Sequence, residues 1–197
     1  MENDAPFEII AAPAKIWVAP VGTAFPVIDV VPNQDWTLLG KAGDKNISED
    51  GVTISHPQSV EVFRALGSTG PRKITRTEED FMISFTLLDL TLEMYRRALN
   101  DSPITQVAAG AAIAGSRKLL LQRGRLVSQF ALIAEGPSPY GDNWTLRYKI
   151  PILVNVGEPE IVFQKGEPAG LMFELQAIEH ETDGFGEIEA QDASRTS

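Results

Sequence analysis

Apolar and polar residues alternate along most of the chain, and this pattern changes in one place. From Phe81 to Leu88 the odd-numbered residues are all apolar, which is typical of a β-strand with one buried face. From Thr91 to Asn100 the apolar residues recur with the spacing of an α-helix. Either Asp89 or Thr91 can accept a hydrogen bond at the start of that helix. The pattern therefore predicts a strand that passes directly into one short helix.

The predicted helix is expected to pack on the sheet through one apolar face. Leu92, Tyr95 and Leu99 lie on that face with Ala98 beside them, and the charged residues take the other side. A change of Leu92 or Leu99 to Asp is therefore expected to destabilise the protein.

The other apolar runs are short and are bounded by glycine, proline and polar residues, as is typical of strands. The clearest is Trp144–Asn155, where apolar residues at even positions alternate with Thr145, Arg147 and Lys149. This alternation predicts one buried and one solvated face. The other predicted strands are Ile16–Ala19, Trp36–Leu39, Val52–Ser55, Ser59–Leu66, Arg117–Gln122, Leu126–Glu135, Glu160–Gln164 and Leu171–Glu179.

Many short strands and one helix predict a mainly β fold, a β-sandwich or barrel-like domain with one short flanking α-helix. The domain is expected to span residues 15–179. Residues 1–14 hold three acidic residues and two prolines with little pattern, and residues 180–197 are polar and acidic, so both are expected to be terminal arms. Long loops are expected within residues 40–73.

The chain of 197 residues has a formal net charge of −10 and no cysteine. An acidic chain is unsuited to gripping nucleic acid through its phosphates, because such binding needs patches of Lys and Arg. The lack of cysteine excludes disulfides and thiolate metal sites. Residues 1–13 have no basic region and no long apolar run, so no signal peptide is expected. The apolar runs are also too short for a membrane span, and a soluble, intracellularly made protein is expected.

Several segments resemble known functional motifs in part. Gly110–Arg117 has the glycine frame of a phosphate loop but lacks its lysine, so an alanine-glycine loop is the better interpretation. Asp44–Gly51 resembles the start of a calcium loop but has Glu49 where glycine is needed, which favours a solvated loop. His56 and His180 are isolated in the sequence, which argues against a zinc site. No catalytic, metal-binding or cofactor-binding residue is identified, and the chain is not expected to be an enzyme.

The three tryptophans, Trp17, Trp36 and Trp144, allow two interpretations. They could form a sugar-stacking platform, or they could be core or interface residues. The second is favoured, because they lie in or beside alternating strands.

Several segments follow one another in a characteristic order. Trp36–Gly40 leads through a polar loop to the turn and strand Glu49–Ile54, and a glycine-rich loop follows. Ile83–Asp89 then passes into the helix Thr91–Leu99, and the chain closes with Leu171–Ala177 and an acidic end. This order resembles the tail tube (major tail) proteins of phages with long, noncontractile tails.

The resemblance covers roughly residues 36–178 and implies a structural role in the virion. Members of this family form hexameric rings that stack into a hollow tube, through which DNA passes without specific binding. Their partners are further copies of the chain and the tape measure, tail terminator and tail-tip proteins. No cofactor and no membrane contact are implied, and the protein would be made in the host cytoplasm.

In this family a long loop and the terminal arms connect successive rings. On this chain they would fall within residues 40–73 and in residues 1–14 and about 180–197. Deletion of residues 41–50 is therefore expected to leave the domain folded and to prevent stacking. The candidate contact residues are Lys41, Asp44, Lys45, Glu49, Asp50, Arg72 and Lys73.

Other functions stay open at this point. The same fold occurs in tail terminators and in the tube protein of type VI secretion. A tail-tip, receptor-binding or glycan-binding β-sandwich is an alternative, as is a hydrolase whose catalytic residues form no recognisable motif. A lectin would be expected to expose aromatic residues on loops, and a hydrolase to show a nucleophile and its base.

Overall fold

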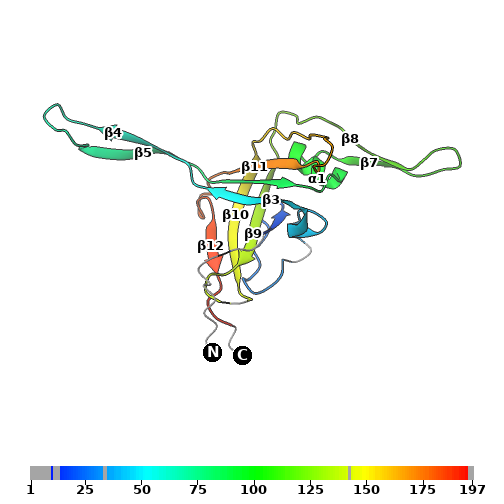
Figure 1. The fold of residues 1–197 in the computed structure, drawn as a ribbon, viewed down its shortest axis with the longest axis horizontal. Helices are drawn as coiled ribbons and strands as arrows, with labels where there is room; N and C mark the ends of the chain where they lie inside the picture. Colours follow the sequence, from blue (N-terminus) through cyan, green and yellow to red (C-terminus); the bar gives the residue numbers. More distant parts are fainter. Residues whose placement is uncertain (1–9, 11–13, 33–34, 142, 195–197) are drawn as a thin grey trace.

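The computed structural model describes residue 10 and residues 14–32, 35–141 and 143–194. These residues form a mainly β structure of antiparallel strands with one α-helix, and the predicted β-sandwich-like fold is confirmed (Figure 1). The predicted N-terminal arm, residues 1–14, lies almost entirely outside the described residues.

Eight strands form the main sheet, in the order β2-β1-β9-β10-β11-β6-β3, and β12 pairs with β10. Two separate hairpins, β4–β5 and β7–β8, complete the strands. The strands of the main sheet are β1 (Lys15–Ala19), β2 (Thr37–Leu38), β3 (Ile47–Ser55), β6 (Met82–Leu87), β9 (Gln129–Pro137), β10 (Thr145–Asn155), β11 (Leu171–Ala177) and β12 (Glu187–Ala190). The other elements are the 3-10 helix η1 (Gly43–Asn46), β4 (Gln58–Phe63), β5 (Lys73–Glu79), α1 (Leu92–Leu99), β7 (Ile104–Val107) and β8 (Ser116–Leu119).

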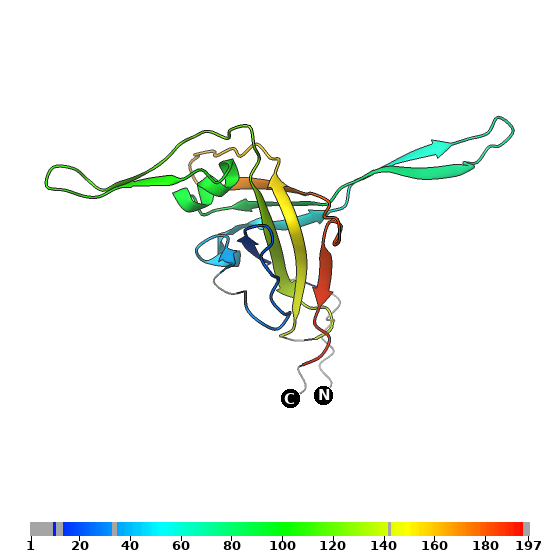
Figure 2. The ribbon, with the colours of Figure 1, turned by 180° about the vertical axis from the view of Figure 1, so that it is seen from behind.

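The long strand β10 divides the sheet into two halves. One side of β10 pairs with β9, whereas its other side pairs first with β12, through Leu146–Lys149, and then with β11, through Leu153–Asn155. Between these two pairings the register shifts from Ile150 to Leu153, and Pro151 lies in the shift. An extra residue of this kind bends a strand and increases its twist. The sheet therefore folds over, and β11, β6 and β3 cross β9 and β10 at a steep angle (Figure 2).

The core lies between the two halves of the folded sheet. As the alternation predicted, Ile83, Phe85 and Leu87 of β6 are buried, and they contact residues of β11 in one cluster. The rings of Phe85 and Phe173 stack with their centroids 5.1 Å apart. The other buried members of this cluster are Ile16, Val18, Leu39, Phe81, Ala98, Leu132, Ala134, Ile150, Leu153, Leu171, Leu175 and Ala177.

Helix α1 flanks the main sheet, where it contacts β11 and packs against the core cluster. Ala98 is 1% exposed and is a member of the core cluster, and Met94 and Tyr95 pack against it. The contact predicted for Tyr95 is confirmed. Leu92 and Leu99, by contrast, are half-buried and lie outside this cluster, so the helix is rotated from its predicted orientation.

The helix ends at Asn100, as predicted, and this residue also anchors a distant segment. Its side-chain amide donates hydrogen bonds to the carbonyls of Arg123 and Leu126, and its side-chain oxygen accepts one from the N–H of Ser128, 2.6 Å away. The side-chain amide of Asn155 donates to the carbonyl of Ala98, 2.8 Å away. The ends of β6 and β10 and the start of β9 are therefore tied to α1 at the same end of the sandwich.

Asp89 connects the strand, the helix and the segment after β2. It is 8% exposed, and its two carboxylate oxygens accept hydrogen bonds from the backbone N–H groups of Thr91 and Lys41, both 2.9 Å away. Burial raises the pKa of Asp89, but the hydrogen bonds to its charged form outweigh this effect and hold the pKa below its ordinary value. Asp89 is thus the residue that stabilises the strand-to-helix junction, and the Thr91 side chain makes no capping bond.

The face of β10 that was predicted to be solvated is buried. Arg147 is 2% exposed and its guanidinium contacts the carboxylate of Glu135 on β9, 2.6 Å away. It also donates hydrogen bonds to the carbonyls of Val27 and Val30, at 2.9 and 2.8 Å. Lys149 is also buried and forms ion pairs with two glutamates of β12. The prediction failed because a loop and a strand from distant parts of the sequence cover this face.

A second buried cluster lies on the same outer side, over β1 and β9. Trp36 packs there with Ala131 and Ile133, and Trp17 and Phe25 contact the cluster at its edge. The indole N–H of Trp36 donates to the carbonyl of Ala24, 3.2 Å away. The interpretation of Trp36 as a core residue is confirmed.

Other predictions require correction. Residues 160–164 form no strand, although Ile161 packs against the core. β8 ends at Leu119, short of the predicted Gln122. In the predicted C-terminal arm, residues 187–190 form β12 and belong to the main sheet. The strands β5, β7 and β12 had no counterpart in the sequence prediction.

A change of Asp89 to Asn is expected to lower the free energy of unfolding at pH 7 by about 1–3 kcal/mol, because the amide places a donor against a backbone N–H. Asp192→Asn, at an exposed position, is the matched control and is expected to have no measurable effect. Urea unfolding followed by circular dichroism measures both.

The same measurement has a pH dependence with a definite sign. Because the folded-state pKa of Asp89 is depressed, its contribution is complete above the unfolded pKa of about 3.9 and is lost as the pH falls through the folded value. The difference between the wild type and Asp89→Asn should therefore shrink below about pH 4. Equal urea midpoints for the two proteins at pH 7 would contradict the assigned role of Asp89.

Candidate functional site: two projecting hairpins

The first hairpin, residues 58–79, projects from one side of the sandwich (Figure 1). Its strands β4 and β5 pair from Gln58↔Glu79 to Phe63↔Lys73, with one bulge beside Val60. At its base the N–H of Asp80 donates to the carbonyl of Pro57, 2.9 Å away. The predicted flexible stretch, residues 67–73, is the tip of this hairpin together with the first residue of β5.

The first hairpin exposes apolar side chains on its surface. Its β4 and β5 form a separate two-stranded sheet, and every residue from 58 to 66 is exposed. An isolated two-stranded hairpin is marginally stable in water at best, because it has no core to cover its apolar side chains. The following apolar residues are each at least 43% exposed: Val60, Val62, Phe63, Leu66 and Ile74.

The second hairpin, residues 104–119, projects from the opposite side of the body, as the two views from front and back agree (Figures 1 and 2). Its tip carries the alanine-glycine loop that the sequence predicted, closed by paired hydrogen bonds between Gly110 and Ile113. Its base contacts α1, and Arg117 forms an ion pair with Glu93. Residues 107–115 hold no charge.

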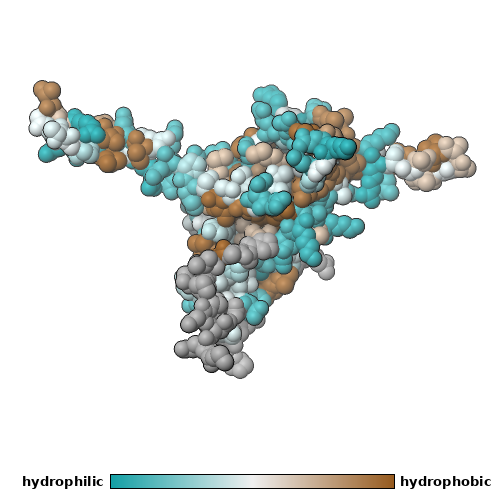
Figure 3. All heavy atoms as spheres, viewed as in Figure 1, coloured by the Kyte–Doolittle hydropathy of each residue, from teal (hydrophilic) through white to brown (hydrophobic). Residues whose placement is uncertain are grey.

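Both hairpins therefore carry exposed apolar side chains, five large ones on the first and Ile113 on the second, in addition to those on the body. In the space-filling view, brown patches follow the first hairpin and mark the tip of the second (Figure 3). A contiguous exposed apolar patch on a protein surface is a candidate site of interaction with another molecule.

The predicted contact residues are separated into three places. Lys41, Asp44 and Lys45 lie on and beside η1, on the body of the sandwich. Glu49 and Asp50 lie in β3, where its register with β6 shifts. The other two, Arg72 and Lys73, lie near the tip of the first hairpin and far from the first two groups (Figure 1).

Residues 41–50 are not the solvated loop that the sequence predicted, because they form η1 and the start of β3. The segment folds tightly, with the side chain of Asn46 accepting from the N–H of Ala42 and its carbonyl accepting from the N–H of Leu88, both at 2.6 Å. From Ile47 onward it is strand, and Ile47 packs against the core. Deletion of residues 41–50 is therefore expected to disrupt the fold rather than to spare it.

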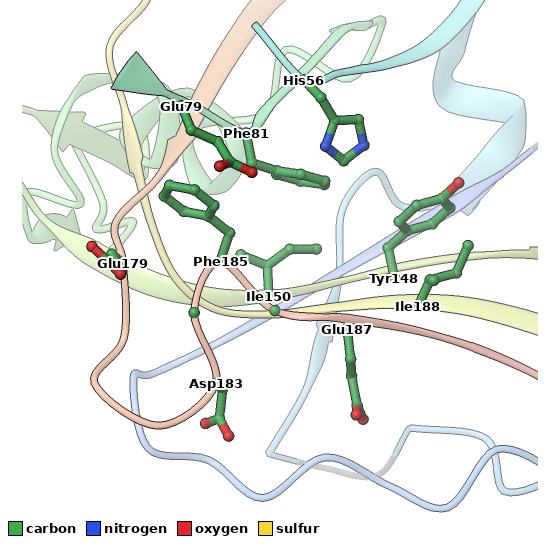
Figure 4. Close-up of a pocket in the computed structure, with 12 residues that line it drawn as sticks. His56, Glu79, Phe81, Tyr148, Ile150, Glu179, Asp183, Phe185, Glu187 and Ile188 are labelled. Atoms are coloured by element: carbon green, nitrogen blue, oxygen red, sulfur yellow. The ribbon is translucent and has the colours of Figure 1, made fainter. Parts of the chain in front are cut away.

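A cavity of about 570 Å³ lies at the base of the first hairpin. Figure 4 shows the rings of Phe81, Tyr148 and Phe185 around this space, with His56 at its upper edge and Ile150 at its floor. The His56 ring meets Phe81 edge-on, with centroids 4.8 Å apart. Four acidic residues also line the cavity, namely Glu79, Glu179, Asp183 and Glu187, but the carboxylates of Asp183 and Glu187 point away from it (Figure 4).

The described residues contain no group of three or more His, Cys, Asp or Glu side chains placed to hold a metal ion. Within the same part of the chain, none of the helices has the length and apolarity that a membrane crossing requires. Trp17 and Trp36 contact one buried cluster, whereas the ring of Trp144 lies against Gly141. The three tryptophans form no shared platform.

A scan against protein-family models found no matching family, and a search of the curated proteins found no match. Neither comparison assigns a family, so the role of the chain has to be inferred from its residues and geometry.

The sequence pattern predicts one strand of the first hairpin, but it predicts neither the pairing of this strand nor the second hairpin. Val60 and Val62 alternate with polar residues, and this alternation predicts a strand. The partner strand, Lys73–Glu79, has Ile74 as its only large apolar residue, so its sequence carries no comparable signal. A glycine-rich stretch between two short strand-like runs, as in residues 62–75 and 105–118, is the signal that could have revealed both hairpins.

Replacement of residues 58–79 by an Asn-Gly turn is expected to leave the body folded. The two ends of the hairpin already lie one hydrogen bond apart, and its apolar side chains contribute no contact to the core cluster. The melting temperature should change by less than about 2 °C. Differential scanning calorimetry provides the measurement.

Deletion of residues 41–50 is the comparison for that experiment. Because it removes Asn46 and the first part of β3, it is expected to abolish cooperative unfolding. A hairpin deletion that destabilises the protein as strongly would contradict the independence of the hairpin from the body.

Proposed function

We propose that this chain is a structural protein that assembles as stacked hexameric rings into the hollow tail tube of a phage with a long, noncontractile tail. The sequence resemblance suggests the family and the sixfold rings. The structural observation that supports the proposal is the pair of hairpins, which project from opposite sides of a β-sandwich and expose apolar side chains (Figures 1 and 3).

The hairpins need a partner surface in order to bury their apolar side chains. Complete burial of one Val, Ile, Leu or Phe side chain contributes about 1.5–3 kcal/mol. The first hairpin offers five such residues, and Val62 and Ile74 face each other across its two strands. A neighbouring copy that covers this face would order the hairpin and gain association energy at the same time.

The opposed positions of the hairpins favour growth by repeated contacts of one kind. A contact that joins two different surfaces of a molecule leaves one of each surface free on the resulting pair. Such contacts close into a ring or continue as a filament, depending on the rotation between neighbours. A tube of stacked rings combines ring closure within each layer with open growth from layer to layer. We propose that the hairpins connect the copies, in place of residues 41–50.

The charge of the chain supports passage of DNA without binding. The chain carries 27 acidic and 17 basic residues, so a tube of many copies is strongly negative. Carboxylates on a tube wall repel phosphate groups and keep a strand from adhering. The proposed partners at the two ends and along the tube are the tail terminator, tail-tip and tape measure proteins, and the proposed location is the phage tail.

The proposal predicts that the purified protein assembles as its concentration rises, which sedimentation velocity measures. Val62→Thr combined with Ile74→Thr keeps two β-branched residues in the hairpin but makes its apolar face polar. We expect this double variant to need at least a tenfold higher concentration for half-maximal assembly.

Glu61→Gln combined with Thr75→Ser alters the directly opposed pair on the other face of the hairpin, and it is expected to assemble as the wild type does. Wild-type protein that stays monomeric at all concentrations would overturn the proposal. Wild-type protein that forms single rings without stacking would point instead to a tail terminator.

A further inference from the structure

The cavity at the base of the first hairpin combines an apolar interior with an acidic rim. Phe81 and Ile150 are buried beneath it, and Tyr148 and Phe185 are half-buried on its walls (Figure 4). An apolar cavity of about 570 Å³ lies within the size range of sites that bind ligands or side chains. Its occupant must therefore carry apolar surface.

The acidic residues at the rim favour an occupant that carries positive charge. Glu79 pairs with Arg76 and Asp183 with His180, whereas the carboxylate of Glu187 pairs with Lys149 on the opposite face of β10. Glu179 lines the cavity and forms no ion pair or hydrogen bond with any part of the chain that the structure describes. A cation brought to this rim would gain a favourable interaction, and an anion would be repelled.

The tip of the first hairpin has the complementary properties. Leu66 stands at the tip and is 109% exposed, so it makes no packing contact within its own chain. From Val62 to Thr77 the sequence holds four bases and no acid. Within the described residues, the side chains of Arg72 and Lys73 form no ion pair or hydrogen bond. The tip therefore carries an exposed apolar side chain, and two cations without a partner among the described residues follow where the tip meets β5.

The tip and the cavity of one molecule cannot meet, because they lie at opposite ends of the same hairpin. His56 and Glu79 at the base of the hairpin line the cavity, whereas Leu66 lies at its far end (Figures 1 and 4). The two surfaces are complementary only between copies. The acidic residues 1–14 hold three acids and no Lys or Arg, so they lack the charge that the rim selects.

We propose that the tip of the first hairpin of one copy inserts Leu66 into the cavity of the next copy, with Arg72 and Lys73 placed at its acidic rim. This inference rests on the proposed function and specifies the surfaces that join the copies. Because tip and cavity are different surfaces, each added copy offers a new tip or a new cavity, and the contact extends head to tail.

A disulfide trap tests the contact directly, because the chain has no cysteine of its own. The full-length double variant Leu66→Cys with Glu179→Cys is assembled and oxidised, and its products are separated on a denaturing gel. We expect a ladder of covalent multimers that extends beyond the dimer. Each single variant should give no product larger than a dimer, since one cysteine can join only two chains.

Leu126→Cys with Glu179→Cys serves as the comparison, because Leu126 is another exposed apolar residue in a basic segment, at 85% exposure. A ladder from this pair and none from the Leu66 pair would overturn the inference in favour of a different occupant. Internally crosslinked monomer from the Leu66 pair would also overturn it.

Charge reversal gives a second, reversible readout. Arg72→Glu and Glu179→Arg are each expected to raise the concentration for half-maximal assembly at least tenfold. The double variant is expected to assemble at a concentration close to that of the wild type. Lys165→Glu changes the net charge as much as Arg72→Glu does, lies outside both surfaces and is expected to have little effect.

Wild-type assembly, measured in parallel by light scattering, distinguishes a failure of the tip-and-cavity contact from a failure of the proposed function. Assembly of the wild type with no ladder and no charge effect overturns the tip-and-cavity contact and leaves the proposed function standing. A wild type that never assembles overturns both.

Discussion

The backbone pairing of β10 is the constraint on which the rest of the structure depends. This strand pairs with β9 along one edge and with β12 and then β11 along the other, so both halves of the sandwich are attached to it. Its register is fixed by the chemistry of its two faces. A shift by one residue would move Arg147 and Lys149 into the core and turn Tyr148 and Ile150 toward the ion pairs with β9 and β12. The shift between Ile150 and Leu153 then provides the bend that lets the sheet fold over.

A body fixed in this way can support elements that do not contribute to its stability. Asp89 and Asn100 hold α1 at one end of the sandwich, and both hairpins begin from ordered strands or from the helix. The hairpins themselves are outside the core cluster, so their sequences are free to serve contacts with other molecules. This division between a rigid body and projecting contact elements suits a subunit that has to fold alone and then assemble. Because the apolar surface of the hairpins is still exposed in the single chain, its burial against another copy would contribute about 25 cal/mol per Å² to association.

The parts of the fold that depend on nearby residues could be predicted from the sequence. The alternation of Ile83, Phe85 and Leu87 and the switch to helical spacing lie within one short segment, and both appear in the structure. The helix was found, but its rotation was not, because the contact between the N–H of Gly40 and the sulfur of Met94 joins residues far apart in the sequence. Arg147 was expected to be solvated for the same reason: the carbonyls of Val27 and Val30 that bind it lie more than a hundred residues away. The hairpins could not be predicted, because both faces of a two-stranded element without a core are exposed and its apolar and polar residues need not alternate.

Direct imaging of the concentrated wild-type protein by electron microscopy tests the central claim most simply. The account predicts hollow tubes of stacked sixfold rings, in which every copy presents the same contacts to its neighbours and the tip of each first hairpin meets another copy. Particles of single-copy size at every concentration, or closed twofold dimers with free hairpin tips, would contradict it.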